Sequence, residues 1–458
     1  MYFFFWIVFF KSAVAFQFPS PWESYGSLQI PVYKDMETLR NIQTKIRQSP
    51  PLVFAGEIRN LRNQLCEVHD GKAFIFQGGP CAEEFGGGID RGLSWTDEIR
   101  NLFTTMVQCS LLLSYGMEKK IIRIGRMAGQ YAKPRSEIYE PDGKTLTYRG
   151  DIVHGKDIRD REPDPTRLLQ AYHESLCTLN VLRSLSKSGD LDLNRLDQWL
   201  DPFVHEIGYY QHMDFDRLFR KWFVFLENCG LPLYSFREPE FFISHEALLL
   251  YYEDALTRKE ISTQNTYNCG AHTVWLGERT RHSEAHLQYL SQIENPIGIK
   301  VGEMRDVNEI KRIVQVLNPN KEKGKIMIIT RMGPNKITHQ LPLLFKALKD
   351  EPILYMSDPC HANTIIIDGI KTRLCSTIQE ELLQFFYCCL EHNIIPAGVH
   401  IEMSGDLVTE CIGQNVTASS LHSRYLTTVD PRMNRYQALE LAFFISSLSN
   451  KISPMIRR

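Results

Sequence analysis

The stretch from residue 297 to residue 356 decides the fold: IGIKVGEMRDVNEIKRIVQVLNPNKEKGKIMIITRMGPNKITHQLPLLFKALKDEPILYM. It contains three short apolar runs of strand length, Ile297–Val301, Ile326–Thr330 and Ile353–Met356. The first two runs are separated by Asp306–Leu317, where apolar residues recur with the period of a helix. Strands that alternate with helices indicate parallel pairing, because the crossover helix returns the chain to the same edge of the sheet.

The same alternation extends to both sides of this stretch. Five further runs have the same character: Ala73–Gln77, Lys120–Ile124, Glu240–Ser244, His272–Leu276 and Gly398–Met403. Further helices are expected at Arg167–Leu185, Glu246–Thr257, Ile378–His392 and Asn434–Leu448. Eight strands in this pattern predict an α/β fold, a (β/α)8 TIM barrel, with a doubly wound sheet as the alternative.

Two segments of the chain are additions to a minimal barrel. Residues 17–70 form an N-terminal extension with expected helices at Met36–Gln48 and Glu57–Val68. The barrel domain then covers residues 71–458 and carries an insertion after the second strand, at about residues 127–239. The first part of the insertion is rich in Pro, Asp, Arg and Gly and is typical of a functional loop, whereas its second part is expected to be helical.

The composition limits the classes of function. The 458 residues include 52 Lys+Arg and 54 Asp+Glu, so the net charge of −2 gives no electrostatic basis for binding nucleic acid. An anionic substrate would need a local cluster of cations. The eleven cysteines are too sparse for a disulfide scaffold, and none form a Cys-x-x-Cys pair, which favours a reducing, cytoplasmic location.

Residues 1–16 form an apolar leader of uncertain status. Tyr2–Phe10 is an unbroken apolar run, and Ala13-Val14-Ala15 resembles a signal-peptidase site. No Lys or Arg precedes the run, and it is too short to span a bilayer, so no membrane partner is expected. We interpret the leader as non-functional or as a mis-assigned start, which leaves secretion or organelle targeting as the alternative.

Polar residues follow the predicted strands, at the end of a barrel where chemistry collects. Four cations are among them: Arg126, Arg279, Lys300 and Arg331. Packed around one pocket, these cations would repel one another unless an anion lay between them. Guanidinium and ammonium groups bind phosphate and carboxylate well. The four cations predict a small substrate that carries both a phosphate and a carboxylate. Lys133-Pro134-Arg135-Ser136 adds a basic loop that suits a second phosphate.

A thiol, an imidazole and a carboxylate also lie at strand ends, on Cys81, His361 and Glu402. This combination suits a borderline divalent ion such as Mn, Fe, Co or Zn. Their separation in the sequence is far wider than a metal motif requires, so a purely structural role for each stays open.

Several long motifs carry a family resemblance. They read SPPLVFAGEIRNLRNQL, RIGRMAGQYAKPRS, AHTVWLGERTR, NPIGIKVG, ITRMG, DPCHANT, GIKTR, GVHIEMSGDLVTECIG and TTVDPRMN. In this order they resemble the type II (plant-like) 3-deoxy-D-arabino-heptulosonate 7-phosphate (DAHP) synthases, from about Pro19 to about Ser449. The resemblance implies a barrel with an N-terminal extension and extra helices after the second strand.

The resemblance also implies the site. Its metal ligands would be Cys81, His361, Glu402 and Asp430, the last in a loop that the strand-end argument misses. The metal expected first is Mn²⁺, with Co²⁺, Fe²⁺ and Zn²⁺ as alternatives. Phosphoenolpyruvate would be bound by Arg126, Glu278, Arg279, Lys300 and Arg331, and erythrose 4-phosphate by Lys133, Pro134, Arg135 and Ser136. Lys371 and Arg373 receive no firm role.

The implied reaction joins phosphoenolpyruvate to erythrose 4-phosphate and releases phosphate, the first step of the shikimate pathway. Glu278 and Lys300 are the hypotheses for catalytic proton transfer. Family members are often homo-oligomers that aromatic amino acids inhibit, so both properties are expected here.

The sequence departs from the family at three places. Pro80 replaces an aspartate before Cys81, Cys360 replaces a methionine before His361, and GDLVTECIGQ replaces GENVTECIGG. These changes keep two alternatives open: a paralogue of secondary metabolism with a related acceptor aldehyde, and a non-catalytic barrel. The four retained ligands argue against the second.

Overall fold

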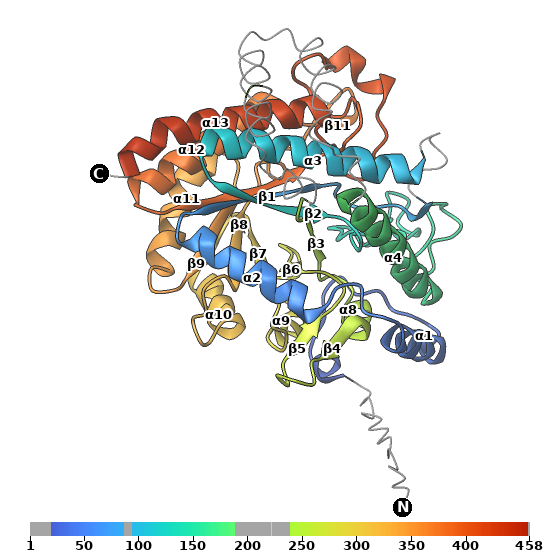
Figure 1. Ribbon diagram of the computed structural model, residues 1–458. Coiled ribbons are helices and arrows are strands. Elements are labelled where there is room, and N and C mark those ends of the chain that lie inside the picture. Colours follow the sequence, from blue (N-terminus) through green and yellow to red (C-terminus); the bar gives the residue numbers. More distant parts are fainter. Residues whose placement is uncertain (1–19, 87–93, 188–220, 222–238, 457–458) are drawn as a thin grey trace, which may run out of the picture.

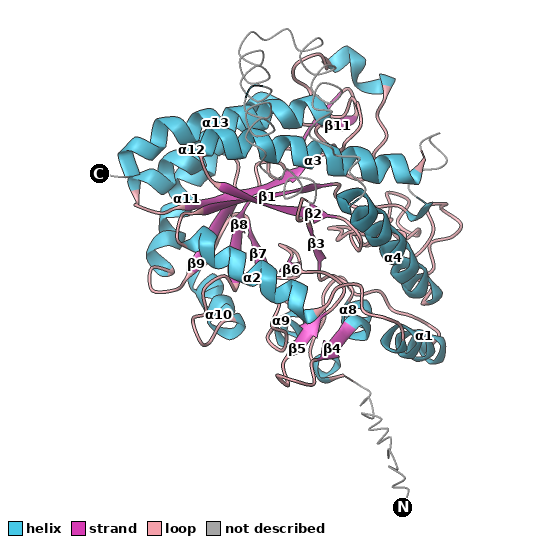
Figure 2. Cartoon of the chain, viewed as in Figure 1, coloured by secondary structure: helices cyan, strands magenta, loops and turns pink. Residues whose placement is uncertain are grey.

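Eight parallel strands close into a barrel in the computed structural model, which describes residues 20–86, 94–187, 221 and 239–456 (Figure 1, Figure 2). The order around the barrel is β1-β12-β9-β8-β7-β6-β3-β2. The strands are β1 (Ala73–Gly79), β2 (Lys120–Arg126), β3 (Phe242–Glu246), β6 (Thr273–Leu276), β7 (Ile297–Val301), β8 (Ile326–Thr330), β9 (Ile353–Ser357) and β12 (Pro396–Glu402). The closed sheet confirms the predicted TIM barrel, since a doubly wound sheet stays open.

An apolar cluster fills the barrel from the N-terminal ends of the strands to their middle. Strand residues such as Ile75, Ile124 and Met327 contribute to it, together with Leu61 and Leu65 of helix α2 (Ala55–His69). All five of these side chains are buried. Because α2 closes this end with apolar side chains, the polar residues inside the barrel gather at the opposite, C-terminal end.

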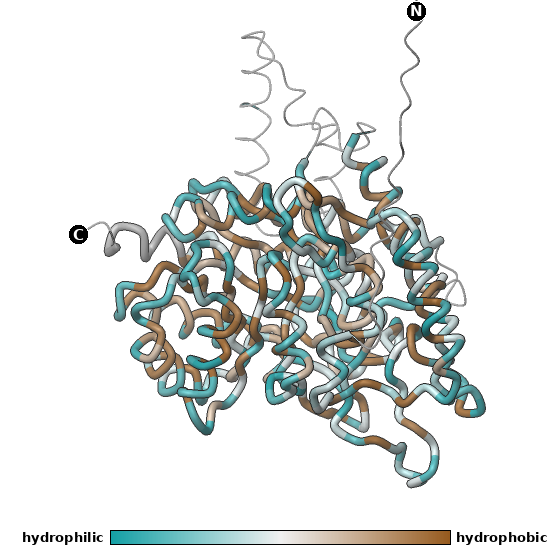
Figure 3. Tube along the Cα trace, turned by 90° about the horizontal axis from the view of Figure 1, so that it is seen from below, coloured by the Kyte–Doolittle hydropathy of each residue, from teal (hydrophilic) through white to brown (hydrophobic). Residues whose placement is uncertain are grey.

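Helices surround the barrel because each buries one face against the strands. In α10 (Val307–Leu317), the buried Ile310, Ile313, Val314 and Leu317 recur at helical spacing, and the Asp306 carboxylate accepts the N–H of Asn308 as an N-cap. Figure 3 shows hydrophobic and hydrophilic segments alternating along the outer chain. The other barrel helices are α3 (Trp95–Met117), α4 (Thr166–Lys187), α8 (Leu250–Leu256), α9 (Glu284–Leu290), α11 (Pro334–Ala347), α12 (Cys375–Glu391) and α13 (Arg435–Ile456).

Two helices from opposite ends of the chain lie side by side in Figure 1, α3 and α13. A Cβ added at Gly116 of α3 would come 2.3 Å from the Cβ of Ser446 on α13, so only glycine allows this approach. The Ser446 hydroxyl donates to the Leu112 carbonyl at 3.1 Å. Helix α3 packs on β1 and β2, and α13 follows the last strand, β12, so the contact between the two helices joins the first and last barrel units.

The N-terminal extension packs on the barrel flank through η1 (Pro21–Ser24) and α1 (Met36–Gln48), near α4 and α8. The buried Arg47 of α1 forms an ion pair with the partly buried Asp254 of α8. Short elements complete the chain: the hairpins β4 (Thr257–Lys259) with β5 (Thr266–Asn268) and β10 (Ile365–Ile367) with β11 (Ile370–Thr372), and η4 (Ala418–Ser423).

The predicted helix of α1 is confirmed residue for residue, and most predicted strands match within two residues. The bounds of one predicted strand, Glu240–Ser244, were two residues too early. The third strand is Phe242–Glu246, because Glu246 still pairs with Trp275 of β6. The helix predicted from Glu246 therefore begins only at Leu250. Helices α3, α9 and α11 were missed; α3 is buried along most of its length and so lacks a polar stripe, α9 is short, and α11 contains Pro342.

The leader, residues 1–16, and most of the second part of the insertion lie outside the described residues. Among the helices that the structure does describe, none combines the length and apolar character needed to cross a membrane. The domain boundaries drawn from the sequence stay predictions.

Candidate active site

A polar cavity opens at the C-terminal end of the barrel, where predicted site residues from separate strands meet. Cys81, Arg126, Lys133, Pro134, Glu278, Arg279, Lys300, Arg331, His361 and Asp430 line it. We call this space the cation cavity. A second, adjoining cavity is lined by Arg135 and Ser136, and it shares with the first Lys133, Pro134, Arg279, Lys371 and Asp430. Together the two cavities are lined by every predicted binding residue except Glu402, which is fully buried.

Four potential ligand atoms converge at one wall of the cation cavity. Cys81, His361, Glu402 and Asp430, here called the metal group, place one ligand atom each within 4.8 Å of the others. Cys81 Sγ lies 3.5 Å from Asp430 Oδ2 and 3.9 Å from His361 Nε2, and His361 Nε2 lies 3.2 Å from Glu402 Oε1. One sulfur, one nitrogen and two carboxylates fit a borderline divalent cation.

Buried partners orient two members of the metal group. His361 Nδ1 lies 2.9 Å from Asp358 Oδ1, and Glu402 Oε2 lies 2.5 Å from Arg373 Nη2. Burial opposes ionisation of Asp358, but His361 and Lys300 hold the pKa of its carboxyl well below the usual value. An ionised Asp358 accepts the Nδ1 proton, which leaves the lone pair of His361 Nε2 facing the metal group.

Lys133 lies closer to the metal group than its predicted role requires. Its Nζ is 2.5 Å from both Cys81 Sγ and Asp430 Oδ2. Burial and the Glu402 charge raise the pKa of the Cys81 thiol to about 12, against the opposing effect of Lys133. A bound divalent cation would instead take Cys81 as a thiolate. Lys133 therefore connects the metal group with the adjoining cavity.

One cation of the cavity, Arg126, is incompletely hydrogen-bonded, although its Nη2 lies 3.6 Å from Glu402 Oε1. Arg126 is 1 % exposed, and its Nε and Nη1 have no hydrogen-bond partner among the residues that the structure describes. Arg126 and Lys300 lie over the Trp275 ring, 5.7 and 5.6 Å from its centroid. A buried, incompletely bonded guanidinium is costly, so its presence indicates an anionic ligand.

The two glutamates that line the cavity differ in their bonding. Both oxygens of Glu278 accept hydrogen bonds, from Arg281 Nη1 at 2.8 and 2.9 Å and from the Gly302 N–H at 2.7 Å. Glu246 also lines the cavity, and its buried Oε1 has no hydrogen-bond partner within the described residues. Sequence reasoning missed Glu246 because the predicted strand ended at Ser244; a strand two residues longer would have placed it at the strand end.

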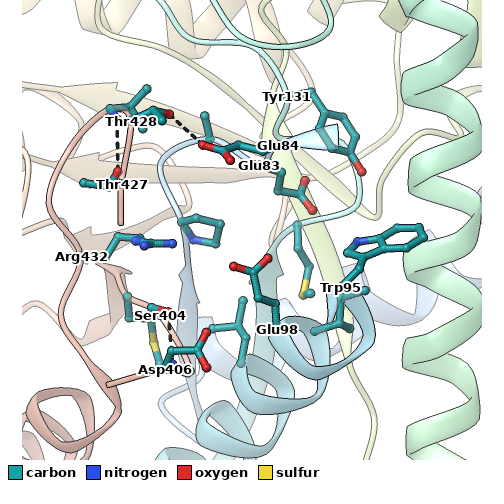
Figure 4. A pocket seen from close by; sticks show the side chains of 18 residues that line it. Glu83, Glu84, Trp95, Glu98, Tyr131, Ser404, Asp406, Thr427, Thr428 and Arg432 are labelled. Atoms are coloured by element: carbon teal, nitrogen blue, oxygen red, sulfur yellow. Dashed lines mark hydrogen bonds between the residues drawn. The ribbon is translucent and has the colours of Figure 1, made fainter. Parts of the chain in front are cut away.

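Residue Pro80, a departure from the family pattern, lines a different pocket. This pocket lies between the start of α3 and the segment after β12, and Figure 4 shows Glu98 and Arg432 reaching into it from these two elements. The other departure near the metal group, Cys360, is fully buried, with its Sγ 3.4 Å from the Glu402 N–H. Neither side chain lines the cation cavity.

Known proteins are similar in sequence to this chain over nearly its whole length. It is 40 % identical over 440 residues to phospho-2-dehydro-3-deoxyheptonate aldolase of Streptomyces coelicolor, which covers 93 % of this chain and 96 % of that protein. It is 37 % identical to the Neurospora crassa protein of the same name, over 93 % of each chain. The AroG aldolase of Mycolicibacterium smegmatis is 35 % identical over 90 % of this chain and 91 % of its own length. Residues 17–446, which hold the whole cation cavity and metal group, match the class-II DAHP synthetase family, and the chain belongs to that family.

Proposed function

We propose that this protein is a metal-dependent DAHP synthase, which condenses phosphoenolpyruvate with erythrose 4-phosphate and water and releases phosphate. This is the first step of the shikimate pathway to the aromatic amino acids. The observation that carries the proposal is the direct junction of the cation cavity with a four-residue metal group. The names of the relatives, which cover more than nine-tenths of the chain, support the same activity.

Phosphoenolpyruvate would occupy the cation cavity. Its phosphate and carboxylate would complete the hydrogen bonding of Arg126 and meet the charges of Arg279, Lys300 and Arg331. Glu278, which is held by Arg281 and Gly302, would keep the adjacent Arg279 segment in place rather than move a proton. The Arg331 guanidinium donates to the His361 carbonyl at 2.9 Å, so the anion site and the metal group are in contact.

Erythrose 4-phosphate would enter through the adjoining cavity, with its phosphate at Lys133, Pro134, Arg135 and Ser136. Both Nε and Nη2 of Arg279 donate to the Ser136 hydroxyl, at 3.1 and 2.9 Å, which joins the two anion sites. A divalent cation held by the metal group would polarise the aldehyde as a Lewis acid. Mn²⁺ is proposed first, with Co²⁺, Fe²⁺ and Zn²⁺ as alternatives.

The reaction needs proton transfer where water adds to the former enol carbon and phosphate leaves. Glu246 and Lys300 line the same cavity, and Glu246 Oε1 has no hydrogen-bond partner among the described residues, whereas both oxygens of Glu278 accept hydrogen bonds. We therefore assign the proton transfer to Glu246 with Lys300.

Replacing Glu246 with glutamine is expected to lower kcat by about 100-fold, because general acid–base groups contribute at least this much. The KM for phosphoenolpyruvate should change little, since the amide keeps the size of the side chain and adds no repulsion. Steady-state kinetics measured beside Glu278→Gln check this. A smaller loss of kcat in Glu246→Gln than in Glu278→Gln would return the role to Glu278.

The decisive experiment follows phosphoenolpyruvate consumption by metal-stripped protein with erythrose 4-phosphate, before and after Mn²⁺ or Co²⁺ is restored. Metal-dependent loss of the enol absorbance would support the synthase. Turnover only with another aldehyde would favour the secondary-metabolism alternative, and folded protein with no turnover on any aldehyde would favour a non-catalytic barrel. A homo-oligomeric state, aromatic effectors and a cytoplasmic location stay predictions from the resemblance and the composition.

A further inference from the structure

Helix α12 contributes a fully buried carboxylate to the C-terminal end of the barrel, that of Glu381. Its Oε1 accepts the backbone N–H groups of Met332 and Gly333, at 3.0 and 2.9 Å. Its Oε2 accepts the side-chain amide of Asn363 at 2.6 Å. These donors belong to the two loops that follow strands β8 and β9, so one carboxylate holds both loops.

Each loop carries a residue of the candidate site. Arg331 directly precedes Met332, and His361 lies two residues before Asn363. The Asn363 amide also donates to the Pro359 carbonyl at 2.8 Å, which ties the turn around His361 to the same carboxylate. The loops meet again in the bond from Arg331 Nη2 to the His361 carbonyl. A substitution of Glu381 would therefore be expected to change the positions of both Arg331 and His361.

The bonding explains why a buried carboxylate occupies this place. Gly333, with φ +79°, is the N-cap of α11, where backbone N–H groups lack partners within the helix and a negative charge is favourable. Burial raises the pKa of Glu381 to about 7, opposed by the hydrogen bonds from Gly333, Met332 and Asn363. A glutamine would fit sterically, but its NH2 group would face the NH2 group of Asn363.

We propose that Glu381 is a positioning residue, which fixes Arg331 and His361 relative to each other and so couples binding of phosphoenolpyruvate to binding of the divalent cation. Glu381 touches neither the cation cavity nor the metal group and acts only through the two loops. The roles of Arg331 and His361 in this proposal rest on the proposed function.

The test is Glu381→Gln in the full chain, with two binding constants measured without turnover. Calorimetry gives the Kd of phosphoenolpyruvate, and electron paramagnetic resonance gives the Kd of Mn²⁺. We expect each Kd to rise about tenfold, the lower end of the effect of residues that orient metal ligands. The KM for erythrose 4-phosphate should stay nearly constant, because the hydrogen bonds of the Glu381 carboxylate within the described part of the chain go to Met332, Gly333 and Asn363 and not to the loop of Lys133 and Ser136.

Glu380→Gln is the matched control, since Glu380 is the exposed neighbour on α12 and should change neither constant. Glu381→Asp keeps the charge on a shorter side chain and should recover part of the Mn²⁺ affinity. Should Glu381→Gln fail to fold, Asn363→Ala cuts only the link to the His361 loop. It should weaken Mn²⁺ binding and leave phosphoenolpyruvate binding to metal-stripped protein unchanged.

Unchanged binding constants in folded Glu381→Gln would overturn the positioning role, as would an equal rise in the KM for erythrose 4-phosphate. Parent protein that binds both probes but makes no product would overturn the proposed function and leave this test valid. Parent protein that binds neither probe would overturn both.

Discussion

Cys81→Ser is expected to abolish metal-dependent turnover and to weaken Mn²⁺ binding by more than about 100-fold, beyond the range seen when only a neighbour of a ligand is lost. The thiolate is the one soft ligand of the metal group, next to the imidazole of His361 and two carboxylates. A serine hydroxyl does not ionise as a thiol does near a divalent cation, so the site loses both charge and softness.

The fold should survive this substitution, because serine is smaller than cysteine and Lys133 still neutralises Asp430. Cys388→Ser is the matched control: both cysteines are 4 % exposed, but Cys388 lies on α12. Mn²⁺ binding by paramagnetic resonance and turnover at saturating Mn²⁺ are the measurements. Parent-like Mn²⁺ affinity in folded Cys81→Ser would remove Cys81 from the metal group.

The barrel was predictable because its strands are short, buried on both faces and separated by helices, as the stretch 297–356 illustrates. The same pattern located the candidate site, since parallel strands bring their carboxyl ends to one end of the barrel. Residues as distant in sequence as Arg126 and Arg331 could therefore be expected in one cavity, and both line it.

What the pattern could not predict depends on tertiary contacts. Asp430 lies in a loop after the last strand, and only the family resemblance pointed to it. Glu246 was not predicted as a site residue because the predicted third strand ended two residues too early. The true end of that strand is set by its pairing with β6. Asp358 and Glu381 show no pattern of their own, because their importance comes from the groups that they contact: His361 for Asp358, and two loops for Glu381.

The lysine at the end of β7 is expected to be the most sensitive member of the cation cavity. Lys300 is 5 % exposed, and its Nζ lies 3.0 Å from Asp358 Oδ2. Burial lowers the pKa of Lys300, against the opposing effect of Asp358, which brings the ammonium closer to the range in which it could give up a proton. Lys300→Met keeps the apolar stem and removes the charge and the proton together.

We expect Lys300→Met to lower kcat/KM for phosphoenolpyruvate by about 1000-fold, because it removes both an anion contact and a proton donor. His361 still pairs with Asp358, so the barrel should fold with a modest loss of stability. Lys325→Met is the matched control. Lys325 is equally buried, but it directly precedes the first residue of β8 and donates to the Ile293 carbonyl instead of lining the cation cavity. Any general cost of removing a buried lysine should therefore appear in both variants. Activity of Lys300→Met within about tenfold of the parent, far below what an acid–base group contributes, would exclude an essential role for Lys300 and leave Glu246 as the sole candidate.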